Sequence, residues 1–421
     1  MKSLKDILKT SQAKQILGLF SINILSIPLG IITSIVVTRY LGAQLYGDYK
    51  FISSIFSFAI LVVTFGFYQA GNRAIVLSKE EKKTQEYFGA ELIISVLLFI
   101  LMSIALVIYA FCDSNIEEKG LRNVLLYTIP FGGIYLIQRL LETTLHACNK
   151  IKILGLIRFL PKIGYLLFSL LAYFYLIGSQ INKLLVILFV YLFTQVIVYL
   201  WALYQLRVKF SNFKLRFNEI WGYNKIFGFN VYLGSLFAIG FNALTEVLIS
   251  YFGIDNTGVG YYSLALHFAT PLAFIPNTIA TTHYKKFASQ SKISSKLIWI
   301  TIIFCIFTLI GLRLILYPFI SYFYGEDFLP VIPICMVASI GVLIYGMADF
   351  FNRFLGANGQ GKALRNASFI VGGSLLLMNL FLIPKYGAYG AAYTKVIAGG
   401  VYLINMLYYY FKYVRLNKNN G

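Results

Sequence analysis

Hydrophobic residues form long runs along this chain, and polar residues gather in the short stretches between them. A helix needs about 20 apolar residues to cross a bilayer core, and about twelve runs are long enough. They cover residues 16–38, 50–71, 88–111, 124–146, 154–177, 184–206, 226–250, 259–281, 297–317, 331–355, 366–384 and 388–411. Since backbone polar groups must be satisfied internally in lipid, helices are the expected spans. The pattern predicts an all-α polytopic membrane protein with about 12 transmembrane helices.

The pattern also repeats at half the length of the chain. With an offset of about 210 residues, Leu145–Lys152 lies over Leu355–Lys362, and Arg39–Tyr49 lies over Ser250–Tyr262. Repeats of this kind are typical of transporters, which hold substrate where two related lobes meet. We therefore expect two parallel six-helix lobes, residues 1–210 with spans one to six and residues 211–421 with spans seven to twelve.

Composition and charge placement agree with a membrane protein. Hydrophobic residues make up 59% of the chain and charged residues 12%. The net charge of +20 would suggest a nucleic-acid partner in a soluble chain, but Lys and Arg gather in alternate connections. The basic segments are the N-terminus and residues 73–83, 150–152, 207–216, 285–296, 362–365 and 412–418. The positive-inside rule places them and both termini in the cytoplasm, so we expect no nucleic-acid partner.

One segment imitates a nucleotide-binding loop. Gly356–Lys362 fits G-x-x-x-x-G-K, but Ala363 stands where a P-loop needs Ser or Thr for magnesium, and predicted spans flank the segment. Its counterpart around Lys152 lacks the glycines, so a tight turn is expected. The connections are too short for a catalytic domain, and the three histidines and four cysteines show no metal-ligand spacing. We expect no enzyme activity, no cofactor and no metal.

Ionisable residues inside the predicted spans are candidates for substrate contact, because a charge at bilayer depth is costly and usually faces a bundle interior or a cavity. On the fourth span Arg139 and Glu142 are spaced i, i+3 and share a face. On the fifth, Arg158 and Lys162 are spaced i, i+4 around Pro161. Two cations on one buried face need an acid or an anionic ligand, so a salt-bridge network with Glu142 and an anion site both fit.

In the second half, Glu246 and Lys395 have no partner nearby in the sequence. Lys395 must point toward another helix or toward the cavity. Glu246 fits either of two roles, a protonated acid in proton coupling or the partner of a cation from the other lobe. His267 lies beside Pro271 and is either a hydrogen-bonded packing residue or a proton-sensing group. We take Glu246 and His267 as candidates for ion coupling.

Polar residues of the first two spans complete the set, although contacts between helices would also explain them. The cavity candidates are Arg139, Glu142, Arg158, Lys162, Lys395, Asn23, Gln69 and Arg73. Buried cations outnumber buried acids, which favours an anionic substrate. Phosphate and pyrophosphate are the natural candidates, because their oxygens match the guanidinium fork.

Two motifs carry a family resemblance. Thr38–Tyr49, with the sequence TRYLGAQLYGDY, resembles the opening of polysaccharide-biosynthesis flippases, which belong to the multidrug/oligosaccharidyl-lipid/polysaccharide superfamily. Asn379–Ala392 resembles that family's link between its eleventh and twelfth spans. Chain length and half-repeat agree with the family over essentially the whole chain. Gly42 and Gly47 of the first motif are interpreted as turn residues.

The resemblance implies a transporter that flips undecaprenyl-pyrophosphate-linked oligosaccharide units from the cytoplasmic to the outer leaflet, by alternating access, for O-antigen or capsule synthesis. Its location would be the bacterial cytoplasmic (inner) membrane. Its partners would be this lipid-linked oligosaccharide and membrane lipid, with a polysaccharide polymerase and glycosyltransferases left open. Two alternatives are a cation-coupled multidrug antiporter of the same superfamily, which would more naturally have an acidic cavity, and a membrane enzyme such as the polymerase, which would need a large outer loop.

Overall fold

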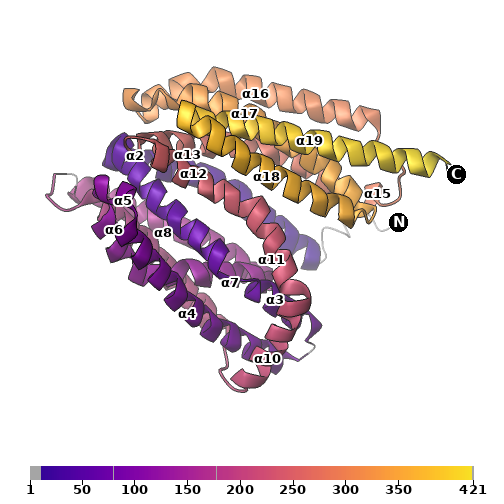
Figure 1. Ribbon diagram of the computed structural model, residues 1–421, viewed down its shortest axis with the longest axis horizontal. Coiled ribbons are helices and arrows are strands. Elements are labelled where there is room, and N and C mark those ends of the chain that lie inside the picture. The colour runs from indigo at the N-terminus through magenta and orange to yellow at the C-terminus, as the bar shows by residue number, and fades with distance from the viewer. Residues whose placement is uncertain (1–10, 79, 177, 420–421) are drawn as a thin grey trace. The chain divides into compact units, whose positions relative to one another are not determined.

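The computed structural model describes residues 11–78, 80–176 and 178–419, and nearly all of them are helical (Figure 1). Within these ranges no strand occurs. Helices long and apolar enough to cross a membrane number seven, or up to eight if the bent pair Arg122–Phe131 and Gly133–Ala147 is one span. The prediction of an all-α chain of membrane spans is confirmed. The lysines of residues 1–10, used in the topology prediction, lie outside the described residues.

Contacts within the chain divide it into two compact units. Unit 1 comprises Met1–Leu41 and Ile55–Leu233, and unit 2 comprises Gly42–Ser54 and Gly234–Gly421. The helix α2 (Ser11–Val63) contributes to both units, and Gly42, at a φ of 76°, interrupts its regular geometry. A positive φ is readily adopted only by glycine. The expected lobe boundary between residues 210 and 211 stays a prediction.

Unit 1 consists of most of α2 and the helices that follow it, including the pair Arg122–Phe131 and Gly133–Ala147, which is bent by 46°. After α2 come α3 (Phe67–Leu77), α4 (Glu81–Cys112), α5 (Ser114–Glu118), α6 (Arg122–Thr128), α7 (Gly133–Ala147), α8 (Ile151–Leu176), α9 (Lys183–Leu206), α10 (Phe213–Tyr223) and α11 (Phe229–Ser235). α7 packs against α3 and α4, and α8 packs along α9. Leu136, Leu140 and Leu141 on α7 are fully buried. Their spacing forms the apolar stripe expected of a helix in a core.

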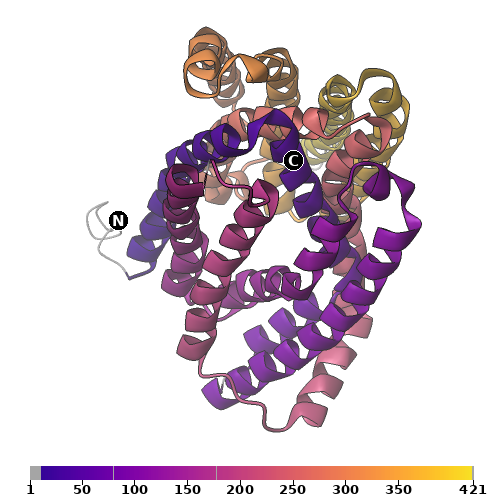
Figure 2. The same ribbon diagram turned by 90° about the vertical axis from the view of Figure 1, so that its left-hand side faces the viewer.

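Unit 2 is dominated by long helices that run side by side (Figure 1). The long helices are α16 (Ser295–Phe323), α17 (Val331–Ala357), α18 (Gly361–Tyr386) and α19 (Ala388–Asn419), and the shorter ones are α12 (Phe241–Phe252), α13 (Thr257–Ala269), α14 (Phe274–Thr282) and α15 (Tyr284–Phe287). Figure 2 views the orange and yellow helices more nearly along their axes. α17 and α18 both pack along α19, around aromatic side chains that include Phe287, Phe350 and Phe354.

Three predicted spans are interrupted, which accounts for part of the difference from the expected number; in addition, most of the first two predicted spans lies on the single helix α2. The fourth is broken by a 3₁₀ turn, Ile129–Phe131, and the eighth by another, Thr270–Ala273. Each turn contains a proline, which lacks the N–H that would continue the helix. The seventh contains two π-helical turns, Asn224–Gly228 and Leu236–Gly240. Such turns often accompany functional sites in helices.

The half-length repeat has a direct structural counterpart at two turns, α7–α8 and α17–α18. Asn149 has a φ of 53° and Gly359 a φ of 73°, and 359 − 149 = 210. The N–H groups of residues 148, 149 and 150 donate to the carbonyls of residues 144, 146 and 145, and those of residues 358, 359 and 360 donate to residues 354, 356 and 355. This is one helix-ending motif in two copies. The predicted tight turn at Gly356–Lys362 is therefore confirmed.

The other repeated segment forms a close helix crossing within unit 2. A Cβ atom on Gly47 would lie 1.8 Å from the carbonyl oxygen of Asn256, and one on Gly260 would lie 3.1 Å from the backbone nitrogen of Gly47. Asn256 Nδ2 also donates to Asp48 Oδ1 at 2.7 Å. The positive φ confirms the turn interpretation of Gly42. For Gly47 it is wrong, since Gly47 lies inside a helix and is small because another backbone touches it.

Candidate functional site

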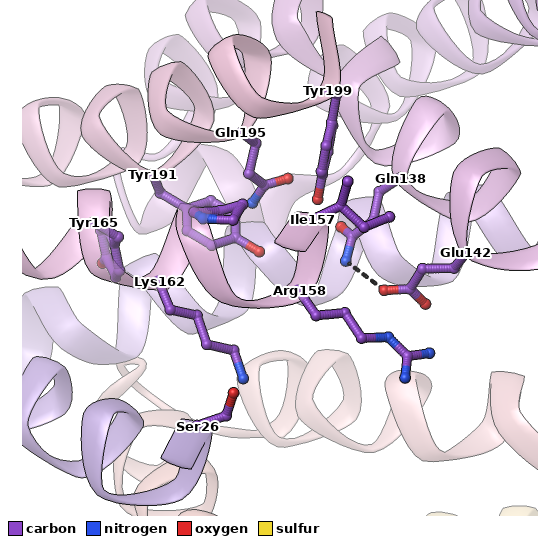
Figure 3. A pocket seen from close by; sticks show the side chains of 11 residues that line it. Ser26, Gln138, Glu142, Ile157, Arg158, Lys162, Tyr165, Tyr191, Gln195 and Tyr199 are labelled. Atoms are coloured by element: carbon purple, nitrogen blue, oxygen red, sulfur yellow. Dashed lines mark hydrogen bonds between the residues drawn. The ribbon is translucent and has the colours of Figure 1, made fainter. Parts of the chain in front are cut away.

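A cavity of about 390 Å³ inside unit 1 brings three of the predicted residues together (Figure 3). Glu142 comes from α7, and Arg158 and Lys162 come from α8. The other lining residues are Ser26, Gln138, Ile157, Pro161, Tyr165, Tyr191, Gln195 and Tyr199. The volume falls within the range of about 300–1,000 Å³ that is usual for ligand pockets.

The two cations reach the cavity from one face of α8. Their spacing of four residues is close to one helical turn, so both side chains project to the same side. Figure 3 shows the guanidinium of Arg158 and the ammonium of Lys162 both pointing away from the tyrosines that line the cavity. Lys162 reaches toward Ser26. This confirms the shared face that the sequence predicted for them.

Glu142 is the single carboxylate among the lining residues. Gln138 Nε2 donates to its Oε1 at 3.3 Å. No ion pair within 4 Å joins Glu142 to Arg139, Arg158 or Lys162 in the described chain, although its charge acts on Lys162 from farther away. With two cations and one acid the lining carries 2 − 1 = +1 formal charge. The cavity thus has positive charge that its own acid does not pair with at close range.

The opposite wall was missed by the sequence reasoning. Tyr191, Gln195 and Tyr199 follow one another at intervals of four residues on α9 and form a polar stripe on an otherwise apolar helix. Tyr191 also meets the ring of Tyr165 edge to face at 5.3 Å. Gln195 Oε1 is buried and has no hydrogen-bond partner among the described residues. The i, i+4, i+8 spacing was visible in the sequence and could have identified this wall.

The other candidates of the first half lie outside the cavity lining. Arg139 acts electrostatically on Tyr68. Arg73 is exposed, with its guanidinium 5.2 Å from the ring centre of Phe227. Gln69 Oε1 is buried and has no hydrogen-bond partner in the described part of the chain. The side chain of Asn23 lies outside the described residues.

A second polar cluster lies in unit 2. The Ser263 hydroxyl donates to Glu246 Oε1, and Lys395 Nζ donates to Asn242 Oδ1 at 3.1 Å. The charges of Lys50 and Lys395 both act on Glu246. Lys395 therefore points toward another helix, α12, as one of the two interpretations had it. Lys50 was missed as a partner because it lies in the first half of the sequence, whereas in the structure residues 42–54 belong to unit 2.

His267, the second candidate for ion coupling, is exposed on α13. Ion coupling at Glu246 and His267 stays a prediction, as do substrate contacts by Arg139, Gln69, Arg73, Asn23 and Lys395.

Outside the spans, Arg216 on α10 has a structural role. Its guanidinium contacts Glu86 at 2.8 Å and Glu219 at 2.7 Å, and its side chain is 7% exposed. Burial opposes ionisation of Glu219, but hydrogen bonds from Tyr87 and Arg216 hold the pKa of this carboxyl below its usual range. Arg216 had been counted with the basic topology residues, and the structure shows that it also ties α10 to α4.

Comparison with known proteins adds family and fold to this geometry. Residues 13–284 match the family described as polysaccharide biosynthesis protein. The capsular polysaccharide biosynthesis protein CapF of Staphylococcus aureus is 23% identical over 93% of this chain and 97% of its own.

Two solved structures are similar throughout. One is a lipid II flippase, MurJ, in an inward closed conformation, with a TM-score of 0.75, 17% identity and coverage of 93% of this chain and 86% of that chain. The other is an inward-facing MATE multidrug resistance transporter of the MOP superfamily, with a TM-score of 0.68, 13% identity and coverage of 93% and 96%. At these identities the likeness concerns the fold, which is that of transporters with two six-helix lobes.

Proposed function

Since the chain belongs to the polysaccharide biosynthesis protein family, we propose that it flips a polyprenyl-pyrophosphate-linked oligosaccharide from the cytoplasmic to the outer leaflet of the bacterial inner membrane. Undecaprenyl is the expected lipid. Both termini would lie in the cytoplasm, in keeping with the basic connections. The observation that carries the proposal is the cavity of unit 1, where Arg158 and Lys162 face a space whose single acid is bound to an amide.

The pyrophosphate and the sugars of such a substrate have matching groups in this cavity. Arg158 can bind two pyrophosphate oxygens at once through its fork, and Lys162 supplies a second positive charge. The tyrosine hydroxyls and the free acceptor of Gln195 suit sugar hydroxyls, and tyrosine rings suit the apolar faces of sugars. The prenyl tail needs no polar partner and would remain in lipid. The similarity to CapF, named for capsular polysaccharide biosynthesis, and to MurJ, named as a lipid II flippase, supports the proposal.

A multidrug antiporter is the second candidate, because the MATE fold matches 93% of the chain. A transporter of cationic drugs needs acids at its binding site, since opposite charges stabilise one another. The cavity of unit 1 has the opposite balance. A cation-selective activity would therefore have to depend on Glu142 alone or on Glu246, where two lysine charges already act.

The test is complementation of a bacterial strain that lacks its own surface-polysaccharide flippase. We expect the chain to restore surface polymer and to make the lipid-linked unit accessible to membrane-impermeant periodate from outside. The double variant Arg158→Gln, Lys162→Gln should leave the unit on the inner leaflet. The matched control is Lys152→Gln, an exposed cation at the start of the same helix.

Two outcomes would count against the proposal. Accumulation of the unit on the inner leaflet, despite normal amounts of wild-type protein in the membrane, would exclude flipping of that substrate. Drug resistance in the same strain without restored polymer would favour the antiporter.

A further inference from the structure

Glu91 on α4 is completely buried in unit 1, and nothing in the site described above uses it. Its exposed fraction is 0%, and neither carboxylate oxygen has a hydrogen-bond partner among the described residues. α3 covers it at Gly71, since a Cβ atom there would lie 1.9 Å from Glu91 Oε1. An ionised carboxylate in this position would have neither water nor a partner, so Glu91 carries a proton in this conformation.

The titratable and charged groups of the neighbouring helices do not neutralise Glu91. From α3, the Tyr68 hydroxyl lies 2.8 Å from Ser95 Oγ. On α7, Arg139 acts on Tyr68. On α10, Arg216 is held by its two glutamate partners.

The remaining titratable neighbour lies at the end of α7. The thiol of Cys148 lies near enough to Glu91 and Lys150 to respond to the ionised form of either. A thiol supplies no positive charge, and Lys150 forms no ion pair with Glu91 among the described residues. Glu91 is thus a buried acid whose ionised form would be left without a counter-charge.

A recess of about 380 Å³ lies about one helical turn from Glu91 along α4, and Glu91 itself is not part of its lining. It is lined by Ile75, Val76, Ser78, Glu80, Glu81, Thr84, Gln85, Phe88, Ala147, Cys148, Lys150 and Leu206. Phe88 precedes Glu91 by about one turn on α4, and Ile75 follows Gly71 by about one turn on α3. The inner end of the recess therefore approaches Glu91 along both helices. The basic connections beside it place its opening on the cytoplasmic side.

We propose that Glu91 is a proton-binding site of the transport cycle, which keeps its proton while Gly71 covers it and exchanges that proton with water of the recess when α3 and α4 separate. On separation the O–H bond of the carboxylic acid breaks, the proton passes to water in the recess, and the carboxylate becomes hydrated. An ordinary exposed glutamate is ionised at neutral pH, so contact between the two helices controls the charge. The proposal rests on the proposed function only in taking the chain as a transporter.

Infrared spectroscopy of the purified protein in lipid at pH 7 tests the protonation directly. A protonated carboxylic acid has a carbonyl stretching band that a carboxylate lacks. We expect this band in the wild type and in the control Glu118→Gln, an exposed acid on α5 that lies outside the recess lining, and its loss in Glu91→Gln. An unchanged band in Glu91→Gln would overturn the proposal, as would its absence from the wild type.

Gly71→Ala separates a proton site from a merely structural acid. The added methyl group would overlap the carboxyl of Glu91, so this carboxyl must leave its covered position or α3 must move away from α4. The band should then weaken although Glu91 is still present. Gly222→Ala, where an added Cβ meets nothing within 4 Å, should leave it unchanged. A full-strength band in Gly71→Ala would show that the helix contact does not control the proton.

Transport supplies the second measurement. Export of the lipid-linked unit by the wild type should slow when nigericin collapses the pH gradient, and the rate in Glu91→Gln should no longer depend on that gradient. The same dependence in both proteins would overturn coupling through Glu91. If the wild type exports nothing, the proposed function fails while the infrared result still decides protonation.

Discussion

The two units place the cations of their membrane spans in different surroundings. In unit 1, Arg158 and Lys162 line a cavity whose only acid, Glu142, is bound to an amide. In unit 2, Lys395 is bound to Asn242, and the charges of Lys395 and Lys50 both act on Glu246. Each cluster has two cations and one acid, but the cations of unit 1 line a cavity that a ligand can enter, whereas Lys395 of unit 2 already has a hydrogen-bond partner on another helix.

This difference leads us to expect that the charges of unit 1 act on a substrate and those of unit 2 on the fold. A buried cation with an internal partner stabilises the helices it joins, and removal of one partner leaves the other uncompensated. A cation that faces a cavity contributes little to folding and much to binding. Substitutions in unit 1 should accordingly change export, and those in unit 2 should change stability.

The largest effect is expected at Arg158. Arg158→Gln should reduce the export rate about 10- to 100-fold, the value of one or two charge-assisted hydrogen bonds. Arg158→Lys should fall between this variant and the wild type, because it keeps the charge and loses the fork. Periodate accessibility of the lipid-linked unit measures the rate, and the melting temperature should stay close to that of the wild type. Equal export by all three proteins would remove Arg158 from the site.

Lys395→Gln should act on stability instead. Glu246 would keep only the charge of Lys50, so we expect a loss of about 1–3 kcal/mol. The double variant Lys395→Gln, Glu246→Gln should recover part of that loss. Thermal unfolding in detergent, followed by fluorescence, gives the three values. A strong loss of export by Lys395→Gln at unchanged melting temperature would show that unit 2 also contacts substrate.

The tyrosine and glutamine wall should have a smaller effect, limited to the sugar. Gln195→Leu removes one neutral hydrogen-bond acceptor, worth about 1 kcal/mol or roughly a five-fold lower rate. The loss should disappear for a prenyl pyrophosphate without sugars, added to proteoliposomes as a fluorescent analogue. An equal loss for both compounds would mean that Gln195 shapes the pocket rather than reads the sugar.

The smallest effect is expected at Glu219, which lies outside both charge clusters and therefore serves as a control for them. The pKa of Glu219 is lower in the folded chain than in the unfolded one. Its contribution to the stability of the fold is therefore complete above the usual glutamate pKa of about 4.3. It is lost as the pH falls through the lower pKa of the folded chain. Because Glu219 is about one-third exposed, the loss should stay below about 1 kcal/mol. In Glu219→Gln the melting temperature should depend less on pH over this acidic range. An unchanged pH profile would contradict the lowered pKa of Glu219.

Local periodicity in the sequence was enough to predict the spans, the repeat and the shared face of Arg158 and Lys162. It could not pair residues that are distant in the chain. Lys50 acts on Glu246 across almost two hundred positions, and Gly47 owes its size to a backbone far along the sequence. The sequence also could not decide whether Gln138 or Arg139 would be the partner of Glu142, and in the structure it is Gln138.

The paired turns at Asn149 and Gly359 have a bearing on ancestry. Their hydrogen bonds coincide bond for bond, yet one copy uses glycine and the other asparagine, the two residues that most readily adopt left-handed backbone. Duplication of a half-length gene would leave this trace, with the backbone conserved and the side chains free to drift. After such a duplication each half could change its charged residues independently, so the two copies of the turn would share a backbone while the two units differ in their charged side chains.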